Sequence, residues 1–227
     1  MKDGHQAERL PDLERYTARD DHARVYPATV TMLWMAAVAA FWATIIFPSS
    51  AWAHVKGGEV AGFLSGMAHP VSGLDHVLAM IAVGLWGAQL GPPAIWLLPV
   101  TFPMVMAFGG LLGLMGVNLP ATEIGIALSA IALGLAVFKE AKLKLPVAAG
   151  LVAFFAVFHG HAHGVELPPG GNGLLYSMGF VVTTGLLHAT GITIGLLHKW
   201  PAGRTALRVA GACVALAGVY FLWSALT

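Results

Sequence analysis

The sequence predicts an all-α fold, a polytopic bundle of transmembrane helices, and three observations support this class. Hydrophobic residues make up 57% of the 227 residues and charged residues only 10%, whereas a soluble domain carries about 25% charge. The mean hydropathy is +0.75. The apolar stretches are long and do not alternate with polar residues, which favours helices over strands.

The charged residues are concentrated at the amino-terminal end of the chain. Residues 1–27 hold five of the twelve Lys and Arg residues and six of the eleven Asp and Glu residues. This segment has no apolar period, so we expect a disordered polar leader on the cytoplasmic side, with Met32 as an alternative start of translation. The net charge of +1 and the lack of a basic patch give no reason to expect a nucleic acid partner.

Residues 28–53 are apolar and end in a pattern typical of a secretory signal peptide. Ala51 and Ala53 supply the small side chains of an A-x-A cleavage pattern. Cleavage would make His54 the new amino terminus, where an amine and an imidazole on one residue could chelate a metal ion. An uncleaved first transmembrane helix is the alternative. Residues 54–227 are then a membrane domain of six helices, with seven spans in all if the signal segment stays.

Six stretches of the membrane domain are expected to cross the bilayer, which takes about 20 residues each. Gly91-Pro92-Pro93 and Asn118-Leu119-Pro120 mark turns between the early spans, and Pro146 fits the first turn of the fourth. The expected spans lie near residues 72–91, 94–117, 121–138, 145–166, 173–198 and 204–226.

Glycines recur in the second and fifth of these spans. Small residues let helices approach closely in lipid, so we expect them to serve packing and to have no chemistry of their own. They are Gly109, Gly110, Gly113, Gly116, Gly179, Gly185, Gly191 and Gly195.

The basic residues determine the expected orientation. The loops that follow the third and fifth spans hold most of those beyond the leader, and the positive-inside rule places both loops in the cytoplasm. The mature amino terminus and the carboxyl terminus are therefore expected on the opposite side. The loop residues are Lys139, Lys142, Lys144, Lys199, Arg204 and Arg208.

The first polar motif, HPVSGLDHVLAMIAVGLW, covers residues 69–86 and opens with His69. The apolar run that follows it is too short to span a bilayer alone, so the helix is expected to begin near Ser72. Asp75 and His76 then lie within the outer edge of the membrane. Ionisable side chains are costly there, and they indicate a functional site by default.

The second polar motif, FHGHAHGVE, closes the fourth span. His159 and His163 are four residues apart and Glu166 follows three later, so all three lie on one helical face, while His161 points elsewhere. Neutral imidazoles with a carboxylate nearby suit a divalent metal ion.

The predicted topology places the two motifs at the same membrane depth. The first span starts at the outer side and the fourth span ends there, so the two sets of polar side chains are expected to form one outer cluster. Its candidate metal ligands are His69, Asp75, His76, His159, His163 and Glu166.

Four further residues are candidates for a transport path. Glu123 lies near the outer start of the third span, Met80 one turn below His76, and His188 near the middle of the fifth span with Thr184 one turn away. Structural roles compete with this interpretation: helix capping for Glu123, core filling for Met80 and helix–helix hydrogen bonding for His188.

Both motifs resemble the signature sequences of the HupE/UreJ family, and the resemblance runs from about His54 to the carboxyl terminus. It implies a small bacterial integral membrane protein that acts as a nickel or cobalt permease and is often encoded with hydrogenase or urease genes. Carried over residue by residue, it points to the same six ligands, places His161 at a variable position and makes His54 the amino-terminal histidine. Residues 1–27 depart from the family pattern.

The leading hypothesis is a permease that imports a divalent metal across the bacterial inner membrane, with both mature termini in the periplasm. No prosthetic group is expected; Ni²⁺, or else Co²⁺ or Zn²⁺, is bound as substrate. Imidazole and carboxylate suit these ions, and the single cysteine, Cys213, argues against a thiolate site for Cu(I). Nickel rather than zinc is implied by the resemblance alone. No GxxxxGK[ST] motif is present, so transport is passive, ion-coupled or driven by another protein.

Two other functions stay open. An intramembrane zinc-dependent hydrolase could use the same side chains, although the sequence lacks the HExxH motif. A protein that delivers metal without transporting it is the third class. Besides the metal ion and the lipid bilayer, hydrogenase or urease maturation proteins and a second copy of this chain are candidate partners.

Overall fold

The computed structural model describes residues 59–166 and 173–227, together with the isolated positions 36 and 40. The predicted leader and His54 lie outside the described residues, as does the signal segment apart from those two positions.

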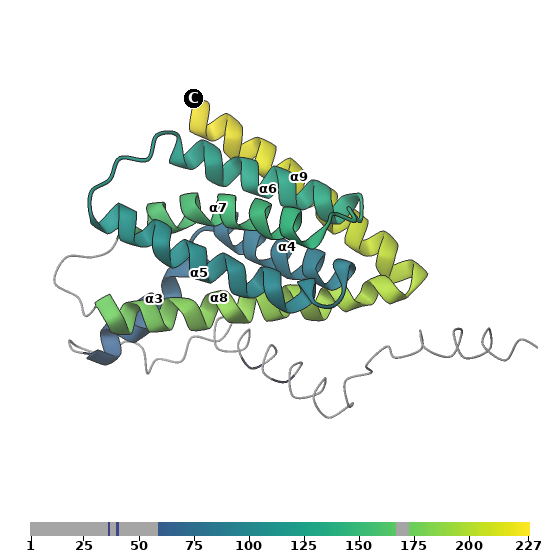
Figure 1. The fold of residues 1–227 in the computed structure, drawn as a ribbon, viewed down its shortest axis with the longest axis horizontal. Coiled ribbons are helices and arrows are strands. Elements are labelled where there is room, and N and C mark those ends of the chain that lie inside the picture. The colour runs from purple at the N-terminus through teal and green to yellow at the C-terminus, as the bar shows by residue number, and fades with distance from the viewer. Residues whose placement is uncertain (1–35, 37–39, 41–58, 167–172) are drawn as a thin grey trace, which may run out of the picture.

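Residues 59–166 and 173–227 form helices and no strand, as the all-α prediction requires (Figure 1). The elements are α3 (Glu59–Ser72), α4 (Leu74–Leu90), α5 (Ala94–Leu114), α6 (Thr122–Phe138), α7 (Leu145–Val165), α8 (Gly173–Gly195), the 3-10 helix η2 (Leu196–Lys199) and α9 (Pro201–Leu226).

Each of the six expected spans corresponds to a helix, from α4 to α9. Four segments are long and apolar enough to cross a membrane alone: α5, α7, α8 with η2, and α9. The count becomes five if α3 and α4 together form one bent span, and α6, with 17 residues, is shorter than a typical span. The chain is therefore a helical membrane protein with four to five candidate spans among its described residues, and the count of six stays a prediction.

Helix α3 is not among the predicted elements, whereas the expected helix start near Ser72 agrees with the start of α4 at Leu74. The chain before it is already helical from Glu59 to Ser72. Gly73 follows in an extended conformation, with φ −104° and ψ 117°. The two helices meet there at an angle of 82°. Because of this bend, the last turn of α3 lies beside the first turn of α4.

Helix α4 lies inside the bundle and packs against α8, α6 and α5 (Figure 1). Met80, Val83 and Trp86 on this helix are fully buried. The other closely packed pairs are α5 with α7, α6 with α9 and α3 with α8. The outward sides of the outer helices carry exposed Leu, Val, Phe and Trp side chains, as expected where a helix faces lipid.

Most of the predicted packing glycines do lie where two backbones touch. A Cβ atom added at Gly109 would lie 2.3 Å from the carbonyl oxygen of Val157, and one at Gly179 would lie 2.1 Å from that of Phe63. Gly185 was expected to behave in the same way, but no atom of residues 59–166 or 173–227 lies within 4 Å of its added Cβ atom. Gly116 instead has a positive φ of 71°, which ends α5.

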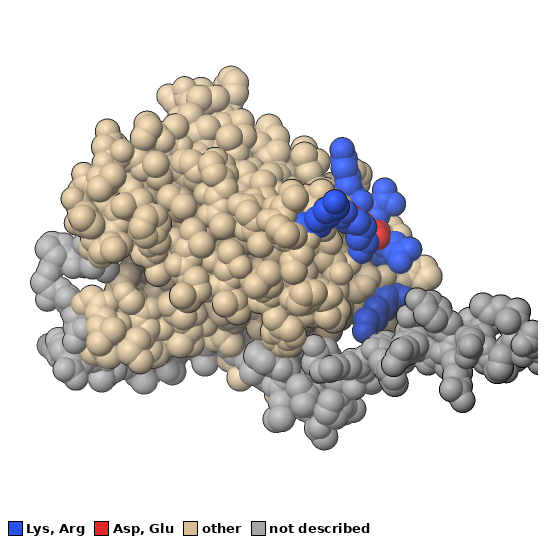
Figure 2. Space-filling model, viewed as in Figure 1, with Lys and Arg blue, Asp and Glu red and all other residues tan. Residues whose placement is uncertain are grey.

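The basic side chains gather at one end of the bundle, beside the turn between α8 and α9 (Figure 2). At this end the connection from α6 to α7 is hydrogen-bonded to α4. The indole of Trp86 donates to the carbonyl oxygen of Ala141 at 2.9 Å, and the ammonium of Lys142 donates to that of Gln89. Lys144 precedes α7 and the second motif ends it, so the basic end and the motif are separated by roughly 30 Å at 1.5 Å per residue.

The glycine contact between α3 and α8 gives a direct test of the unexpected helix. We expect Gly179→Ala to destabilise the protein by about 2 kcal/mol, because the methyl group forces two backbones apart. Gly185→Ala, on the same helix but with open space around it, is the matched control. Thermal unfolding in detergent and hydrogen exchange over Glu59–Ser72 are the measurements. Equal stability and equal exchange in the two variants would contradict this packing of α3 on α8.

Candidate metal centre

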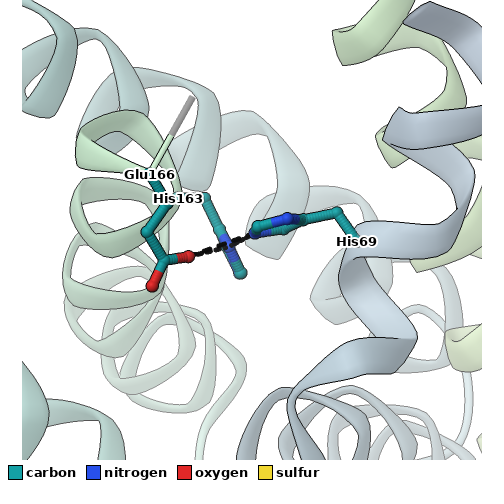
Figure 3. Close-up of side chains that lie close together, drawn as sticks. All are labelled: His69, His163 and Glu166. Carbon is teal, nitrogen blue, oxygen red and sulfur yellow. Dashed lines mark hydrogen bonds and ion pairs between the residues drawn. The ribbon is translucent and has the colours of Figure 1, made fainter. Parts of the chain in front are cut away.

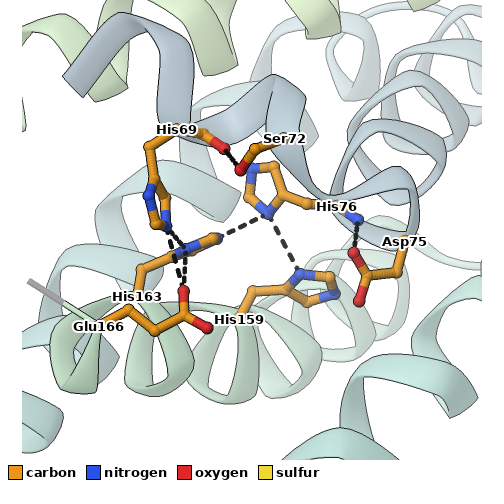
Figure 4. Close-up of polar contacts among 7 residues, drawn as sticks. All are labelled: His69, Ser72, Asp75, His76, His159, His163 and Glu166. Atoms are coloured by element: carbon orange, nitrogen blue, oxygen red, sulfur yellow. Dashed lines mark hydrogen bonds and ion pairs between the residues drawn. The ribbon is translucent and has the colours of Figure 1, made fainter. Parts of the chain in front are cut away.

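The two polar motifs meet in one cluster of side chains (Figure 4). This cluster lies where α7 ends, and the basic residues lie where α7 begins. His69 comes from the last turn of α3, and His76 from the first turn of α4. His159 and His163 occupy the last two turns of α7, and Glu166 caps that helix. Because α4 begins at the end of the bundle where α7 finishes, residues more than 80 positions apart come into contact.

His69, His163 and Glu166 form the outer part of the cluster, which we call the outer triad (Figure 3). The Nε2 atom of His69 lies 2.9 Å from Nδ1 of His163 and 3.1 Å from Oε2 of Glu166. His163 Nδ1 lies 3.7 Å from the same carboxylate oxygen. One nitrogen from each imidazole and one oxygen therefore face a common point.

His76 and His159 form the inner part, which we call the inner pair. His76 Nδ1 lies 3.1 Å from Nε2 of His163 and 3.3 Å from Nδ1 of His159. The imidazole of His163 thus belongs to both parts, because its Nδ1 faces the outer triad and its Nε2 faces the inner pair. The cluster is a continuous chain of polar contacts and not two separate sites.

The hydroxyl of Ser129, on α6, determines which nitrogen of His159 faces the cluster. It donates its proton to the carbonyl oxygen of Ile126 at 2.6 Å. Its oxygen, 2.8 Å from Nε2 of His159, must therefore accept from that nitrogen. Nδ1 of His159 is then unprotonated and presents its lone pair to His76, which is the form a metal ligand needs.

The solvent exposure of the cluster side chains falls steadily from Glu166 to His159. The side chain of Glu166 is 58% exposed, that of His69 22% and that of His163 17%. His76 and His159 are 2% and 1% exposed. The carboxylate therefore lies at the mouth of the cluster and the inner pair lies inside the bundle.

Aromatic rings from α8 enclose the imidazoles. The ring centroid of Phe180 lies 4.7 Å from that of His163 and 5.6 Å from that of His76, and the ring of Tyr176 lies 5.7 Å from His69. A hollow of about 390 Å³ between α5, α7 and α8 is lined in part by His163 and both aromatic residues. The site thus has an apolar wall on one side and an opening beside His163.

The spacing of the ligand atoms is suitable for a transition-metal ion. With metal–nitrogen bonds of about 2.0–2.1 Å, neighbouring ligand atoms are separated by roughly 2.9 Å in an octahedral shell and about 3.4 Å in a tetrahedral one. The imidazole nitrogens of the cluster lie 2.9–3.3 Å apart. Neutral imidazole and carboxylate are preferred ligands of Ni²⁺, Co²⁺ and Zn²⁺.

Asp75, one of the six predicted ligands, and Glu123, which was predicted for the transport path, do not join these contacts among the described interactions. Oδ1 of Asp75 accepts the backbone N–H of His76 at 2.7 Å, and the carboxylate lies to the side of the imidazoles (Figure 4). Glu123 is exposed at the start of α6, where a carboxylate favours the helix end, and has no contact with the imidazoles among the described interactions. His161 faces away, as predicted, and its Nε2 donates to the carbonyl oxygen of Val117 at 2.7 Å.

The other three residues predicted for the transport path are all inside the bundle. Met80 and Thr184 are fully buried, and His188 is 1% exposed. The ring of Phe102 on α5 touches both His159 and His188, with centroid distances of 5.4 and 5.8 Å. His188 of α8 and His159 of the inner pair therefore share one aromatic neighbour.

Ser129, Tyr176 and Phe180 contribute to the site without having been predicted from the sequence. Ser129 is a polar residue within an apolar helix, and such residues often bond to a neighbouring helix. That signal could have identified it. The two aromatic residues are four positions apart on α8, but aromatic spacing of this kind is also typical of ordinary packing.

Comparisons with known proteins agree with the two motifs. The family model described as HupE / UreJ protein matches residues 42–221. A curated relative, Protein HupE of Rhizobium leguminosarum bv. viciae, is 49% identical over 180 residues, which are 79% of this chain and 94% of the relative. No solved structure matches the chain.

The role of Ser129 leads to a testable prediction. In the wild type we expect the ring of His159 to carry its proton on Nε2, and in Ser129→Ala we expect this preference to be lost because the acceptor is gone. Metal affinity should fall by about 10- to 100-fold, as it does when the partner of a ligating histidine is removed. Ring ¹⁵N and ¹³C chemical shifts of labelled His159 and calorimetric titration with Ni²⁺ are the measurements.

Thr193→Ala is the control, since this hydroxyl donates to its own helix, at the carbonyl oxygen of Ala189. A wild-type His159 protonated on Nδ1 would show that Ser129 does not determine the tautomer.

Proposed function

The chain belongs to the HupE/UreJ family, and on that premise we propose that it imports a divalent transition metal, with nickel as the first candidate, across the bacterial inner membrane. The family consists of membrane proteins linked to nickel handling for hydrogenase and urease, and it is a metal-transport or accessory family rather than an enzyme family. Transport itself, the metal and its direction are our proposal.

The convergence of the two motifs is the observation that carries this proposal. Five side chains with metal-binding atoms, from three helices, form one chain of contacts that runs from an exposed carboxylate to two buried imidazoles. A site for a structural metal would be closed and uniformly buried. A graded series of ligands instead suits a substrate that arrives from water, loses its hydration shell in steps and moves on.

The outer triad is the proposed capture site. Glu166 attracts the cation and offsets its charge, while His69 and His163 replace bound water with imidazole nitrogen. Because Nε2 of His163 faces His76, an ion that leaves Nδ1 in the outer triad can next be bound by Nε2 together with the inner pair. Met80, Thr184 and His188 then continue the route inward. Glu123 and Asp75 act at the rim by their negative charge rather than as ligands.

The distribution of charge supports the orientation. The six basic loop residues lie at the end of the bundle opposite the cluster (Figure 2). With the positive-inside rule, the basic end is cytoplasmic and the outer triad faces the periplasm. The carboxyl terminus follows α9 to the periplasmic side. Hydrogenase or urease maturation proteins are the partners we propose for the released metal.

Uptake by intact cells gives the first test. We expect cells that express the wild type to accumulate radiolabelled Ni²⁺ above empty cells, and His163→Ala to lose most of this uptake because one imidazole serves both parts of the cluster. His198→Ala is the matched control. This histidine lies at the basic end, and its ring donates to the carbonyl oxygen of Gly195. Co²⁺ and Zn²⁺ as competitors report the preferred metal.

Purified protein in liposomes separates the alternatives. Uptake by the protein alone supports a permease, whereas metal binding without uptake would show a delivery protein. A wild type that neither binds nor takes up metal at equal expression would contradict the proposal.

The charge of Glu166 gives a second test. Glu166→Gln keeps the size of the side chain but removes its negative charge, so we expect the affinity for Ni²⁺ to fall by about tenfold or more. Glu140→Gln is the control, because that carboxylate lies at the basic end, 3.5 Å from Arg204. Equal affinity in the wild type and Glu166→Gln, measured by titration in detergent, would remove Glu166 from the ligand set.

A further inference from the structure

His188 has an unusual environment for a buried histidine. It is 1% exposed, and neither of its ring nitrogens has a hydrogen-bond partner among the described residues. Thr184, one turn before it on the same face of α8, is fully buried, and its hydroxyl oxygen has no partner in this part of the chain either. Burying unpaired polar groups costs free energy, so such groups in a native protein call for an explanation.

The neighbouring residues show that this is not a general property of α8. The hydroxyl of Thr183 donates to the carbonyl oxygen of Met67 at 2.9 Å. Those of Thr190 and Thr193 donate to their own helix at 2.8 Å. Thr184 has the same option of bonding to its own helix, yet its hydroxyl oxygen bonds to nothing in the described part of the chain.

Three observations place His188 near the inner pair and further inside the bundle. The ring of Phe102 touches both His159 and His188. The Nε2 atom of His76 is buried and unpartnered as well, so this imidazole has a free nitrogen beyond the one that it directs toward His163 and His159. A Cβ atom at Gly84, two turns further along α4 than His76, would lie 2.3 Å from the carbonyl oxygen of His188.

We propose that His188 and Thr184 form a second, inner binding station for a divalent transition-metal ion, which receives the ion from His76. This inference rests on the proposed function and adds a step to it. One neutral imidazole and one hydroxyl make a weak site, and weak binding is what a transport step needs, because an ion held tightly at this depth would not leave. The unpartnered atoms gain a partner only while the ion is present.

The experiment compares His188→Ala and Thr184→Val with His198→Ala and Thr190→Val, all as full-length protein. Ni²⁺ uptake into liposomes and Co²⁺ titration in detergent are measured for each. We expect His188→Ala to keep the tight Co²⁺ binding of the outer cluster, to lose the weaker binding step and to reduce uptake by about tenfold. Thr184→Val should have a smaller effect in the same direction, and the two controls none.

The retained tight binding shows that a variant is folded, and His188→Gln replaces His188→Ala if the latter loses it. A His188 variant with wild-type uptake and an unchanged titration would overturn the inner station while the permease stands. If the wild type transports nothing but its weak Co²⁺ binding step disappears in the His188 variant, the proposed permease function is wrong and the inner binding station is supported.

Discussion

The outer half of this bundle depends on contacts between imidazoles. Ionisable side chains that lie among apolar helices must find partners, and His69, His76, His159 and His163 find them mainly in one another. These contacts join α3 and α4 to α7, and Ser129 extends them to α6. A bundle of the same helices could be packed with apolar residues at these positions at lower cost. A bound ligand therefore explains this series of polar contacts best.

The second motif places histidines on one face of α7 and glycines on another. His159 and His163 face α3 and α4, whereas Gly160 and Gly164, one position further along, lie against α5. A Cβ atom at either glycine would lie about 2 Å from a carbonyl oxygen of α5, 2.0 Å for Gly160 and 2.1 Å for Gly164. The two glycines thus let α7 pack closely on α5. This close packing holds the imidazoles of α7 in position toward α4. Such rigidity keeps ligand atoms at coordinating distance before the metal arrives.

Hydropathy and turn residues were enough to predict the helices from α4 to α9, because long apolar segments in a membrane have few alternatives to a helix. They did not reveal α3, whose last turn contains Pro70 and which is separated from α4 only by Gly73. The meeting of the two motifs followed from the order of the spans. The position of Asp75 could not be predicted in this way, because the sequence cannot show that its carboxylate accepts the next backbone N–H. Ser129 and the aromatic wall depend on how the helices are rotated, which spacing alone leaves undetermined.

X-ray absorption spectroscopy at the nickel edge of the purified, Ni²⁺-loaded protein tests the central claim most directly, because it reports which side chains surround the ion. We expect scattering from two or more imidazole rings together with oxygen ligands, and a loss of imidazole scattering in His163→Ala. A bound nickel ion without imidazole scattering, or one whose spectrum is unchanged in His163→Ala, would show that the histidine cluster is not the metal site.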